Sequence, residues 1–277
     1  MKHIEGITIN HDSSAYTELL LRSLYDRNPE VEGLNITVMD NSSDDDTQPM
    51  MNYADEKGIP VKPTPERYLG YGNSHGEILR DFVLEHLHAD YFLFLDTDIA
   101  FLEDDTISIM EKQLAAVPDA FGIQALLSHN GIDEQPLGSD YCAPEMLYRS
   151  VSRVAEKDRG KIGLPTTAHP LPSRMKHRIH PCCCLVRNSE AFKLVTEIIG
   201  FSPAGTLENA CGKTFDTFGL MTQVMRTHQL KHIYSTKMVL HFIGATHANT
   251  PGKEQLRDRL LNQFRLKQQS DEVLEVE

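Results

Sequence analysis

Long apolar runs are absent from this sequence of 277 residues. No run approaches the roughly 18–20 residues of a transmembrane helix, so we expect no membrane span. The chain begins with charged residues and soon reaches a strand-like segment, without the apolar core of a signal peptide. We therefore expect a cytoplasmic protein in which the sequons at Asn35 and Asn41 are not glycosylated.

Positive charge is scarce in this chain. It has 27 Lys and Arg residues against 40 Asp and Glu residues, a net charge of −13. This balance disfavours a basic surface for nucleic acid, so we expect no nucleic-acid partner. A local basic group either meets an anionic ligand or forms a solvated loop; its members are Arg174, Lys176, His177, Arg178 and His180.

Cysteine is also rare, with five residues, of which Cys182–Cys184 are consecutive. This is not the pattern of a disulfide framework and indicates a reduced protein. Neighbouring residues of a strand point to opposite faces, so the three cannot converge on one tetrahedral zinc ion. A thiolate site with His180 and Cys211 is an alternative, but we interpret the three cysteines as small buried hydrophobic residues.

The first half of the chain alternates between strand and helix patterns. We expect strands at residues 4–10, 35–40, 59–64 and 91–95, and helices at residues 15–28, 49–58 and 77–88. Short connections between alternating elements imply right-handed crossovers and a mostly parallel sheet. Residues 91–95, YFLFL, are apolar at every position, as expected of a strand that helices cover on both faces.

The second half is less regular. We expect strands at 121–127, 182–188 and 237–244, and helices at 143–157, 189–200, 216–229 and 253–269. Neither a repeat nor a low-complexity linker divides the chain. We therefore predict one α/β domain over residues 1–277, with a mostly parallel central sheet flanked by helices.

Three of the predicted strands end in polar residues. The strand ends read Asn10-His11-Asp12, Asp40-Asn41-Ser42 and Asp96-Thr97-Asp98. In parallel sheets, ligands bind beyond the carboxyl ends of the strands. These polar ends therefore predict a binding site along one edge of the sheet.

Asp96 and Asp98 are candidates to hold a divalent metal ion. Mg²⁺ and Mn²⁺ prefer carboxylate oxygens and share them with substrate phosphates. Both side chains can reach one point if the chain turns directly after the strand. The alternative is that both carboxylates only cap a turn.

Several stretches also resemble a known family, and they occur in the right order. They are ITINHDSSAYTELLLRSL, ITVMDNSSDDDT, LGYGNSHGEIL, YFLFLDTDI, FDTFGLMTQVMR and HFIGATH. Together they resemble the GT-A-fold glycosyltransferases, specifically the family 2 group with bacterial rhamnosyl- and galactosyltransferase-like enzymes. The likeness covers residues 4–105 well and 180–247 loosely, whereas residues 128–180 match nothing in the family.

The resemblance implies a metal-dependent enzyme. It would move a sugar, with inversion, from a nucleoside-diphosphate sugar to the hydroxyl of a glycan or another acceptor, using Mn²⁺ or Mg²⁺. Residues 1–105 would bind the nucleotide sugar, residues 106–250 would carry the acceptor and catalytic half, and residues 251–277 would form a helix and tail. Tryptophan is absent, so nine tyrosines would provide any aromatic stacking on sugars.

The resemblance also implies roles for individual residues. Thr8, Asn10, Asp40 and Asn41 would line the nucleotide pocket, although Asp40 and Asn41 also suit an Asx-turn. Gly70 and Asn73 belong to a Gly-rich loop whose backbone amides, before a helix, could face a phosphate. Asp44–Asp46 are expected to be solvated. Asp96 would contact both the donor and the metal ion.

Three further positions complete the implied site. Asp98 would bind the metal ion together with His241 or His247, since neutral imidazole is a common ligand. Asp216 would be the general base for the acceptor hydroxyl, with Glu208 as the alternative. Asp216 also suits the acidic position at a helix start, and a single histidine also suits a structural role.

Three rival functions use similar features. A nucleotidyltransferase would need a Gly-rich loop with a basic residue after the first strand, where this chain reads NHDSSAYTE. A haloacid-type phosphatase usually has its D-x-D at the first strand, whereas here it ends the fourth. A catalytically silent sugar-nucleotide or glycan-binding protein is not distinguished by sequence.

Overall fold

The structure is a computed structural model that describes most of the chain. The described residues are 2–29, 31–68, 74–129, 132–133, 141–142, 161, 174–175, 178–201, 217–242 and 252–275. Their strands are β1 (Ile4–Asn10), β2 (Leu34–Asp40), β3 (Val61–Pro63), β4 (Tyr91–Leu95), β5 (Ile99–Phe101), β6 (Ala120–His129), β7 (Ile132–Asp133), β8 (Tyr141–Cys142), β9 (Arg174–Met175), β10 (Cys183–Arg187) and β11 (Lys231–His241). Their helices are α1 (Ser14–Arg27), α2 (Gln48–Lys57), α3 (Ser74–Glu85), α4 (Thr106–Ala115), α7 (Glu190–Ile198), α8 (Gly219–Thr227) and α9 (Lys253–Glu275), with a 3₁₀ turn η1 (Glu66–Tyr68).

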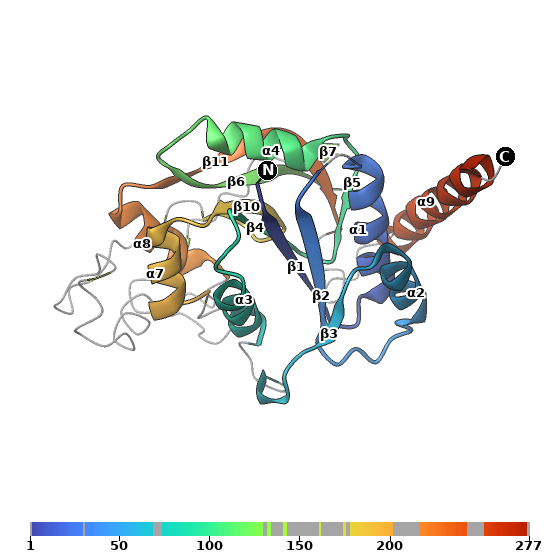
Figure 1. Cartoon of the computed structure of the whole chain (residues 1–277), viewed down its shortest axis with the longest axis horizontal. Helices are drawn as coiled ribbons and strands as arrows, with labels where there is room; N and C mark the ends of the chain where they lie inside the picture. The colour runs from blue at the N-terminus through green and yellow to red at the C-terminus, as the bar shows by residue number, and fades with distance from the viewer. Residues whose placement is uncertain are drawn as a thin grey trace.

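One mixed sheet forms the centre of the described structure, with the order β3-β2-β1-β4-β10-β6-β11-β5 and β7 beside β6 (Figure 1). Strands β1 to β4 are parallel to one another, and β11 is parallel to β6. Strand β10 lies between β4 and β6 and runs antiparallel to both, as β5 does to β11. The sheet is therefore mostly parallel, as predicted.

Strand β4 is the most deeply buried of the parallel strands, and its side chains divide between two apolar cores. Phe92 and Phe94 pack on one face of the sheet, and Tyr91, Leu93 and Leu95 on the other. All five residues are buried. A strand with helices on both faces requires apolar residues at every position, which explains the sequence YFLFL.

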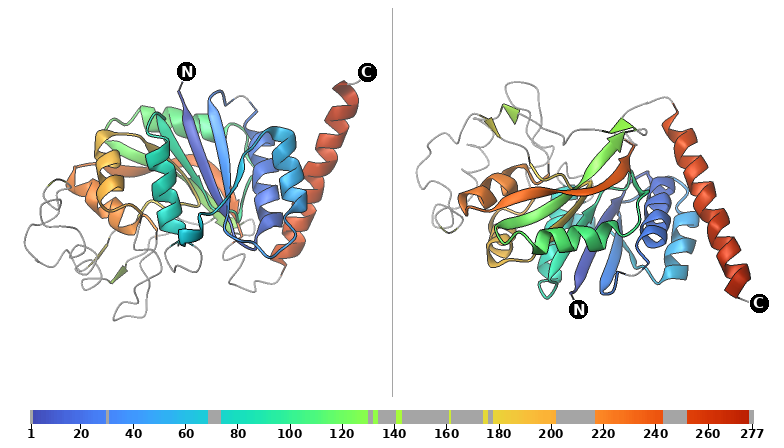
Figure 2. Two further views of the ribbon diagram at one scale, coloured as in Figure 1. Left: turned by 60° about the horizontal axis from the view of Figure 1, so that its bottom comes forward. Right: turned by 90° about the horizontal axis from the view of Figure 1, so that it is seen from above.

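Helices cover both faces of the sheet in a three-layer arrangement (Figure 2). Buried residues of α3, α7 and α8 pack on the face of Phe92 and Phe94. Buried residues of α1, α2 and α4 pack on the opposite face. The layers hold the carboxyl ends of β1, β2 and β4 at one edge, where the predicted site lies.

Helix α9 comes after the last strand in the chain and packs against α1 (Figure 2). Arg265 Nε donates a hydrogen bond of 2.9 Å to Oε1 of Glu18, a residue only 1% exposed. Buried Leu261 and Phe264 add an apolar contact with Tyr16. Among the described helices, none is both long enough and apolar enough to cross a bilayer.

The described elements differ from the prediction mainly after Asp98. Strand β5 and helix α4 were not predicted. Three residues are too short for a periodicity signal, whereas Asp105, the N-cap of α4, is a signal that could have found the helix. Strand β11 begins six residues earlier than the expected 237–244 segment. The predicted helix at residues 143–157 lies outside the described residues.

Replacing Phe94 with Ala tests the core beneath the site. Phe94 is 1% exposed and lies 5.3 Å from Phe201 and 5.0 Å from Phe218, measured between ring centroids. Its removal leaves a cavity, so we expect the free energy of unfolding in urea to fall by about 3–5 kcal/mol. The control Leu266→Ala changes an exposed side chain of α9 and should stay within about 0.5 kcal/mol. Equal losses in both variants would contradict this description of the core.

Candidate active site at the strand ends

The ends of β1 and β2 are joined by the side chain of Asn10. Its Nδ2 lies 2.9 Å from Oδ1 of Asp40 and 2.8 Å from Oγ of Ser43, as a donor. Its Oδ1 accepts hydrogen bonds from Ser13 Oγ at 3.1 Å and Thr17 Oγ1 at 2.8 Å. Asn10 is fully buried, and its hydrogen bonds connect the carboxyl ends of β1 and β2 and the start of α1 beneath the surface.

The loop after β2 caps helix α1. Asp45 accepts hydrogen bonds from the backbone N and the Oγ of Ser14, both at 2.7 Å. Asp44, Asp45 and Asp46 are exposed, as predicted, and Asp45 in addition binds the start of α1. A carboxylate at a helix N-terminus satisfies an unpaired N–H group and interacts favourably with the helix dipole.

A second connection leads from α1 to the D-x-D segment. Ser13, the N-terminal cap residue of α1, has its Oγ 3.1 Å from Oγ1 of Thr97. Because the Ser13 hydroxyl donates its one proton to Asn10, Thr97 is the donor in this contact. Thr97 lies between the two aspartates. The contact with Ser13 directs the Thr97 side chain toward α1. The contacts of Asp96 and Asp98 come from other elements.

Strand β10 brings two further side chains to Asp96. The antiparallel register pairs Cys183 with Leu95, and the backbone N–H of Asp96 donates to the carbonyl of Cys182 at 3.0 Å. His180 Nδ1 lies 4.0 Å from Asp96 Oδ2, and His180 Nε2 lies 3.9 Å from Cys182 Sγ. The backbone N–H of His180 donates to Oε1 of buried Gln124 at 2.7 Å.

Strand β11 brings His241 to Asp98 from the other side. The backbone N–H of Phe242 donates to the carbonyl of Asp98 at 2.8 Å. His241 Nε2 lies 3.5 Å from Asp98 Oδ1 and 3.6 Å from Cys182 Sγ. Two carboxylates, two imidazoles and one thiol thus share one region at the carboxyl end of β4.

The electrostatics of this region favour a bound cation. Burial raises the pKa of Asp96, and the nearby charge of Asp98 raises it further. Burial and the same two aspartates also raise the pKa of the Cys182 thiol. A divalent ion between the two carboxylates would relieve their repulsion. The donor set therefore fits a divalent metal ion.

The start of α8 lies close to the same region. Thr217 accepts a hydrogen bond from Arg178 Nη1 at its carbonyl, at 2.7 Å, and its Oγ1 lies 3.1 Å from His75 Nδ1. Arg178 is 3% exposed, so it is a buried structural residue and does not belong to a solvated loop. Phe218 follows with φ of +67°, a left-handed conformation that is strained for a bulky residue.

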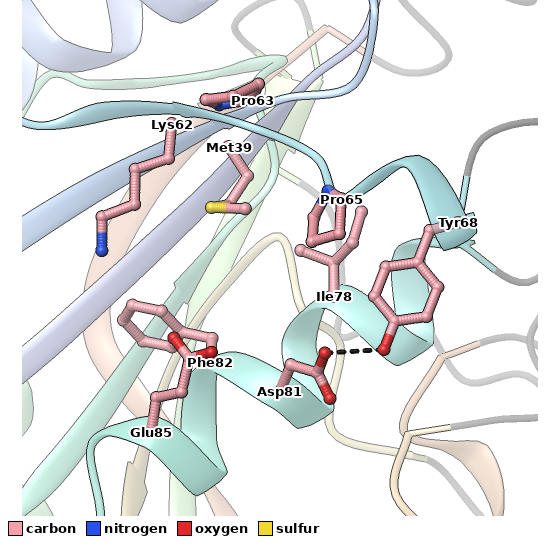
Figure 3. Close-up of a pocket in the computed structure, with 9 residues that line it drawn as sticks. All are labelled: Met39, Lys62, Pro63, Pro65, Tyr68, Ile78, Asp81, Phe82 and Glu85. Atoms are coloured by element: carbon pink, nitrogen blue, oxygen red, sulfur yellow. Dashed lines mark hydrogen bonds between the residues drawn. The ribbon is translucent and has the colours of Figure 1, made fainter.

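A small pocket opens beside the end of β2, on the face that α3 covers (Figure 3). Its lining residues come from β2, β3, η1 and α3 and are Met39, Lys62, Pro63, Pro65, Tyr68, Ile78, Asp81, Phe82 and Glu85. The register of β2 and β3 places Pro63 beside Asp40. Its volume of about 160 Å³ is below the roughly 300–1,000 Å³ of whole-ligand pockets, so it would hold only one ring of a larger ligand.

The described structure brings some predicted site residues together. Asp96, Asp98 and His241 form one group, and Asp40 and Asn41 lie at the adjoining end of β2. Thr8 and Asn10 are fully buried below the carboxyl ends of the strands, and their role in a nucleotide pocket stays a prediction. Other predicted residues lie outside the described residues: Gly70, Asn73, Glu208, Asp216 and His247.

His180 and Cys182 were not predicted as members of this site. Strand periodicity could not have found them, because both residues lie before β10, in the turn that leads into that strand. Their partner strand could not be identified from sequence, since β10 pairs with a strand about 90 residues earlier in the chain. All three cysteines are buried in the two apolar cores, as predicted, and Cys182 lies beside the site as well.

Comparisons with known proteins identify the fold. No family model and no curated protein matches the sequence. Among solved structures, the mannosyltransferase PcManGT from Pyrobaculum calidifontis, in complex with GDP-Man and Mn²⁺, has a TM-score of 0.55 at 15% identity over 89% of this chain. The S. aureus TarS fragment 1-349 in complex with UDP-GlcNAc has a TM-score of 0.52 at 15% identity over 95% of this chain.

The likeness is one of fold. The complex of the same TarS fragment with UDP has a TM-score of 0.51 at 16% identity, over 95% of this chain. This chain spans 59% of the length of PcManGT and 65–66% of the two TarS chains. The chain has the GT-A fold, as the sequence resemblance predicted.

Replacing Asp96 with Asn tests whether burial and the nearby Asp98 raise the pKa of the Asp96 carboxyl. A carboxyl whose folded pKa is raised binds its proton more tightly when folded, so stability falls as pH rises from its ordinary pKa of 3.8 to the folded value. In metal-free protein at pH 7, we expect Asp96→Asn to raise the melting temperature, and the gain to vanish below about pH 4.

The control for this experiment is Asp104→Asn, whose side chain is 70% exposed. It should leave the melting temperature nearly unchanged across the same pH range. A lower melting temperature of Asp96→Asn at pH 7 would show that the carboxylate stabilises the metal-free fold, contrary to this description.

Proposed function

We propose that this protein is a glycosyltransferase that moves a sugar from a nucleoside-diphosphate sugar to an acceptor hydroxyl. The observation that carries the proposal is the group of Asp96, Asp98 and His241 at the carboxyl ends of the strands of a GT-A fold. The complexes of PcManGT with GDP-Man and Mn²⁺ and of TarS with UDP-GlcNAc support it.

The nucleoside of the donor would lie at the end of β2. Asp40 uses its Oδ1 to accept hydrogen bonds from Asn10 and Ser43, so a ribose or base would meet Oδ2. Asn41 continues the same edge, and the pocket of Figure 3 borders it with space for one ring. Gly70 and Asn73 precede α3, whose N-terminus would face the diphosphate.

Asp98 and His241 would hold the divalent cation, with Asp96 beside them. When bound, the cation would offset the negative charge of the leaving diphosphate. Mn²⁺ and Mg²⁺ both suit carboxylate ligands. The protein's own contribution is to fix both aspartates in place through the backbone bonds of Asp96 to Cys182 and of Phe242 to Asp98.

The acceptor would enter from the side of α8. Asp216 directly precedes Thr217, whose carbonyl and hydroxyl are fixed by Arg178 and His75. We assign Asp216 as the base that takes the proton of the acceptor hydroxyl while its oxygen attacks the anomeric carbon. A single displacement of this kind inverts the anomeric configuration, and Glu208 is the alternative base.

Nucleotide binding tests the donor site. Calorimetry with UDP, GDP and dTDP should show one preferred nucleotide whose binding requires Mn²⁺ or Mg²⁺. Asp98→Ala should lose this metal-dependent binding, because it removes a carboxylate from the cation. The control Asp104→Ala changes an exposed aspartate and should bind like the wild type.

Two results of this calorimetry would count against the proposal. Equal binding with and without metal would leave a nucleotide site but remove the metal role of Asp98. No binding of any nucleotide would reject the donor site itself. Binding without sugar transfer to any acceptor would favour the catalytically silent binding protein.

Replacing Asp216 with Asn tests the general base. We expect kcat to fall by about 10²- to 10⁴-fold, because the acceptor hydroxyl loses its proton acceptor, while donor binding is unchanged. The control Glu190→Gln, at an exposed position with a 92% exposed side chain, should retain wild-type kcat. An Asp216→Asn variant with wild-type kcat would assign the base to another residue, and Glu208→Gln would then be measured.

A further inference from the structure

Three side chains beside the D-x-D segment form a compact group of metal-ligating atoms. One donor atom each from Asp96, His180 and Cys182 lies within 4.8 Å of the other two. They come from two antiparallel segments, the end of β4 and the turn that leads into β10. The function proposed above uses Asp96 alone of these three.

Two of the three distances in this group match those between ligands of a single metal ion, and the third, from Cys182 Sγ to His180 Nε2, is longer. Its Sγ lies 3.6 Å from His241 Nε2 and 3.9 Å from His180 Nε2, and His241 Nε2 lies 3.5 Å from Asp98 Oδ1. A tetrahedral ion with bonds of about 2.3 Å to sulfur and 2.0–2.1 Å to nitrogen separates its ligands by about 3.3–3.6 Å. Small side-chain movements would therefore complete a coordination shell.

Cys182 differs from its two neighbours in the polar atoms that lie near its thiol. All three cysteines are buried: Cys184 packs with Phe92 and Phe94, and Cys182 and Cys183 pack in the opposite apolar core. The thiol of Cys182 also lies near two imidazoles and Asp96. A small hydrophobic residue would serve the core equally well, whereas only a thiol adds a soft ligand at this position.

The surrounding backbone holds these ligands in place. Buried Gln124, on β6, accepts the hydrogen bond of the His180 N–H, and Asp96 N–H donates to the carbonyl of Cys182. Such supporting bonds orient metal ligands in proteins. The arrangement is therefore built into the pairing of β4, β10 and β6.

We propose that Cys182 and His180 are ligands of the divalent cation at this site, so that it binds Zn²⁺ or Co²⁺ more tightly than Mn²⁺ or Mg²⁺. Thiolate and imidazole ligands favour Zn²⁺ and Co²⁺, whereas carboxylates alone favour the harder ions. This inference deepens the proposed function and rests on it only for the place of the donor diphosphate next to the cation.

Binding of Co²⁺ alone tests the inference without any nucleotide. Metal-free wild-type protein with Co²⁺ should show a sulfur-to-cobalt charge-transfer band in the near ultraviolet. Cys182→Ala should lose the band and bind Zn²⁺ and Co²⁺ at least about tenfold more weakly, since even supporting residues of metal sites contribute about 10- to 100-fold. His180→Gln should keep the band with reduced affinity.

The matched control is Cys183→Ala, which removes the neighbouring thiol and leaves the same Cβ. It should keep both the band and the wild-type affinity, because among the described residues Cys182, and not Cys183, belongs to the group of ligand atoms with Asp96 and His180. Thermal melting of every variant shows that it is folded, and Cys182→Ser provides a second variant with a polar side chain of similar size.

Two outcomes would overturn the inference: a Co²⁺ spectrum and affinity unchanged by both Cys182 substitutions, or a band lost equally in Cys183→Ala. The proposed function fails separately, through nucleotide calorimetry. A band that depends on Cys182 supports the inference even in a protein that binds no nucleotide. Nucleotide binding that depends on Asp98, without any such band, rejects the inference alone.

Discussion

Two backbone hydrogen bonds, one on each side of the D-x-D segment, determine the geometry of the site. The N–H of Asp96 donates to the carbonyl of Cys182, and the carbonyl of Asp98 accepts from the N–H of Phe242. The first bond extends the pairing of β4 with β10, and the second extends the pairing of β5 with β11. Because β10 pairs with β4 and β11 pairs with β5, they bring residues from the second half of the chain to the ends of strands from the first half.

The cores on the two faces of the sheet keep this arrangement rigid. Phe92 and Phe94 pack under α3, α7 and α8, and Leu93 and Leu95 pack under the helices of the other face. The same packing holds Phe218 in its left-handed conformation, which costs about 1–3 kcal/mol at a non-glycine residue. Strain of this kind persists only where surrounding contacts fix the chain, and here it lies two residues after the proposed base.

The carboxylates that would bind the cation lower the stability of the metal-free protein. Burial of Asp96 next to Asp98 disfavours both negative charges in the metal-free protein, as the raised pKa of Asp96 indicates. A cation reverses this effect, so the fold is expected to gain stability from the ligand that the site binds. The apolar packing of the rest of the sheet offsets the cost in its absence.

The sequence predicts the parts of the fold that depend on local pattern. Alternating elements predicted the parallel strands β1 to β4, and the apolar run before Asp96 predicted a strand covered on both faces. The polar strand ends predicted the edge where Asp40, Asp96 and Asp98 lie. These features depend on short segments whose periodicity is visible without any partner.

Other features depend on pairing between distant segments, which periodicity cannot specify. The pairing of Cys183 with Leu95 joins residues 88 positions apart, and it alone brings Cys182 and His180 to Asp96. Asn10 was expected at the nucleotide, but its side chain is buried in hydrogen bonds to Asp40, Ser13 and Thr17. A polar strand end is visible in sequence, whereas the direction of its side chain depends on the neighbouring loops.

The most direct test of the central claim is anomalous diffraction from crystals grown with Mn²⁺ and the preferred nucleoside diphosphate. The account predicts one manganese peak between Asp98 and His241, in contact with the diphosphate, and the nucleoside at Asp40. A manganese peak away from both residues, or a nucleotide bound elsewhere on the molecule, would contradict it.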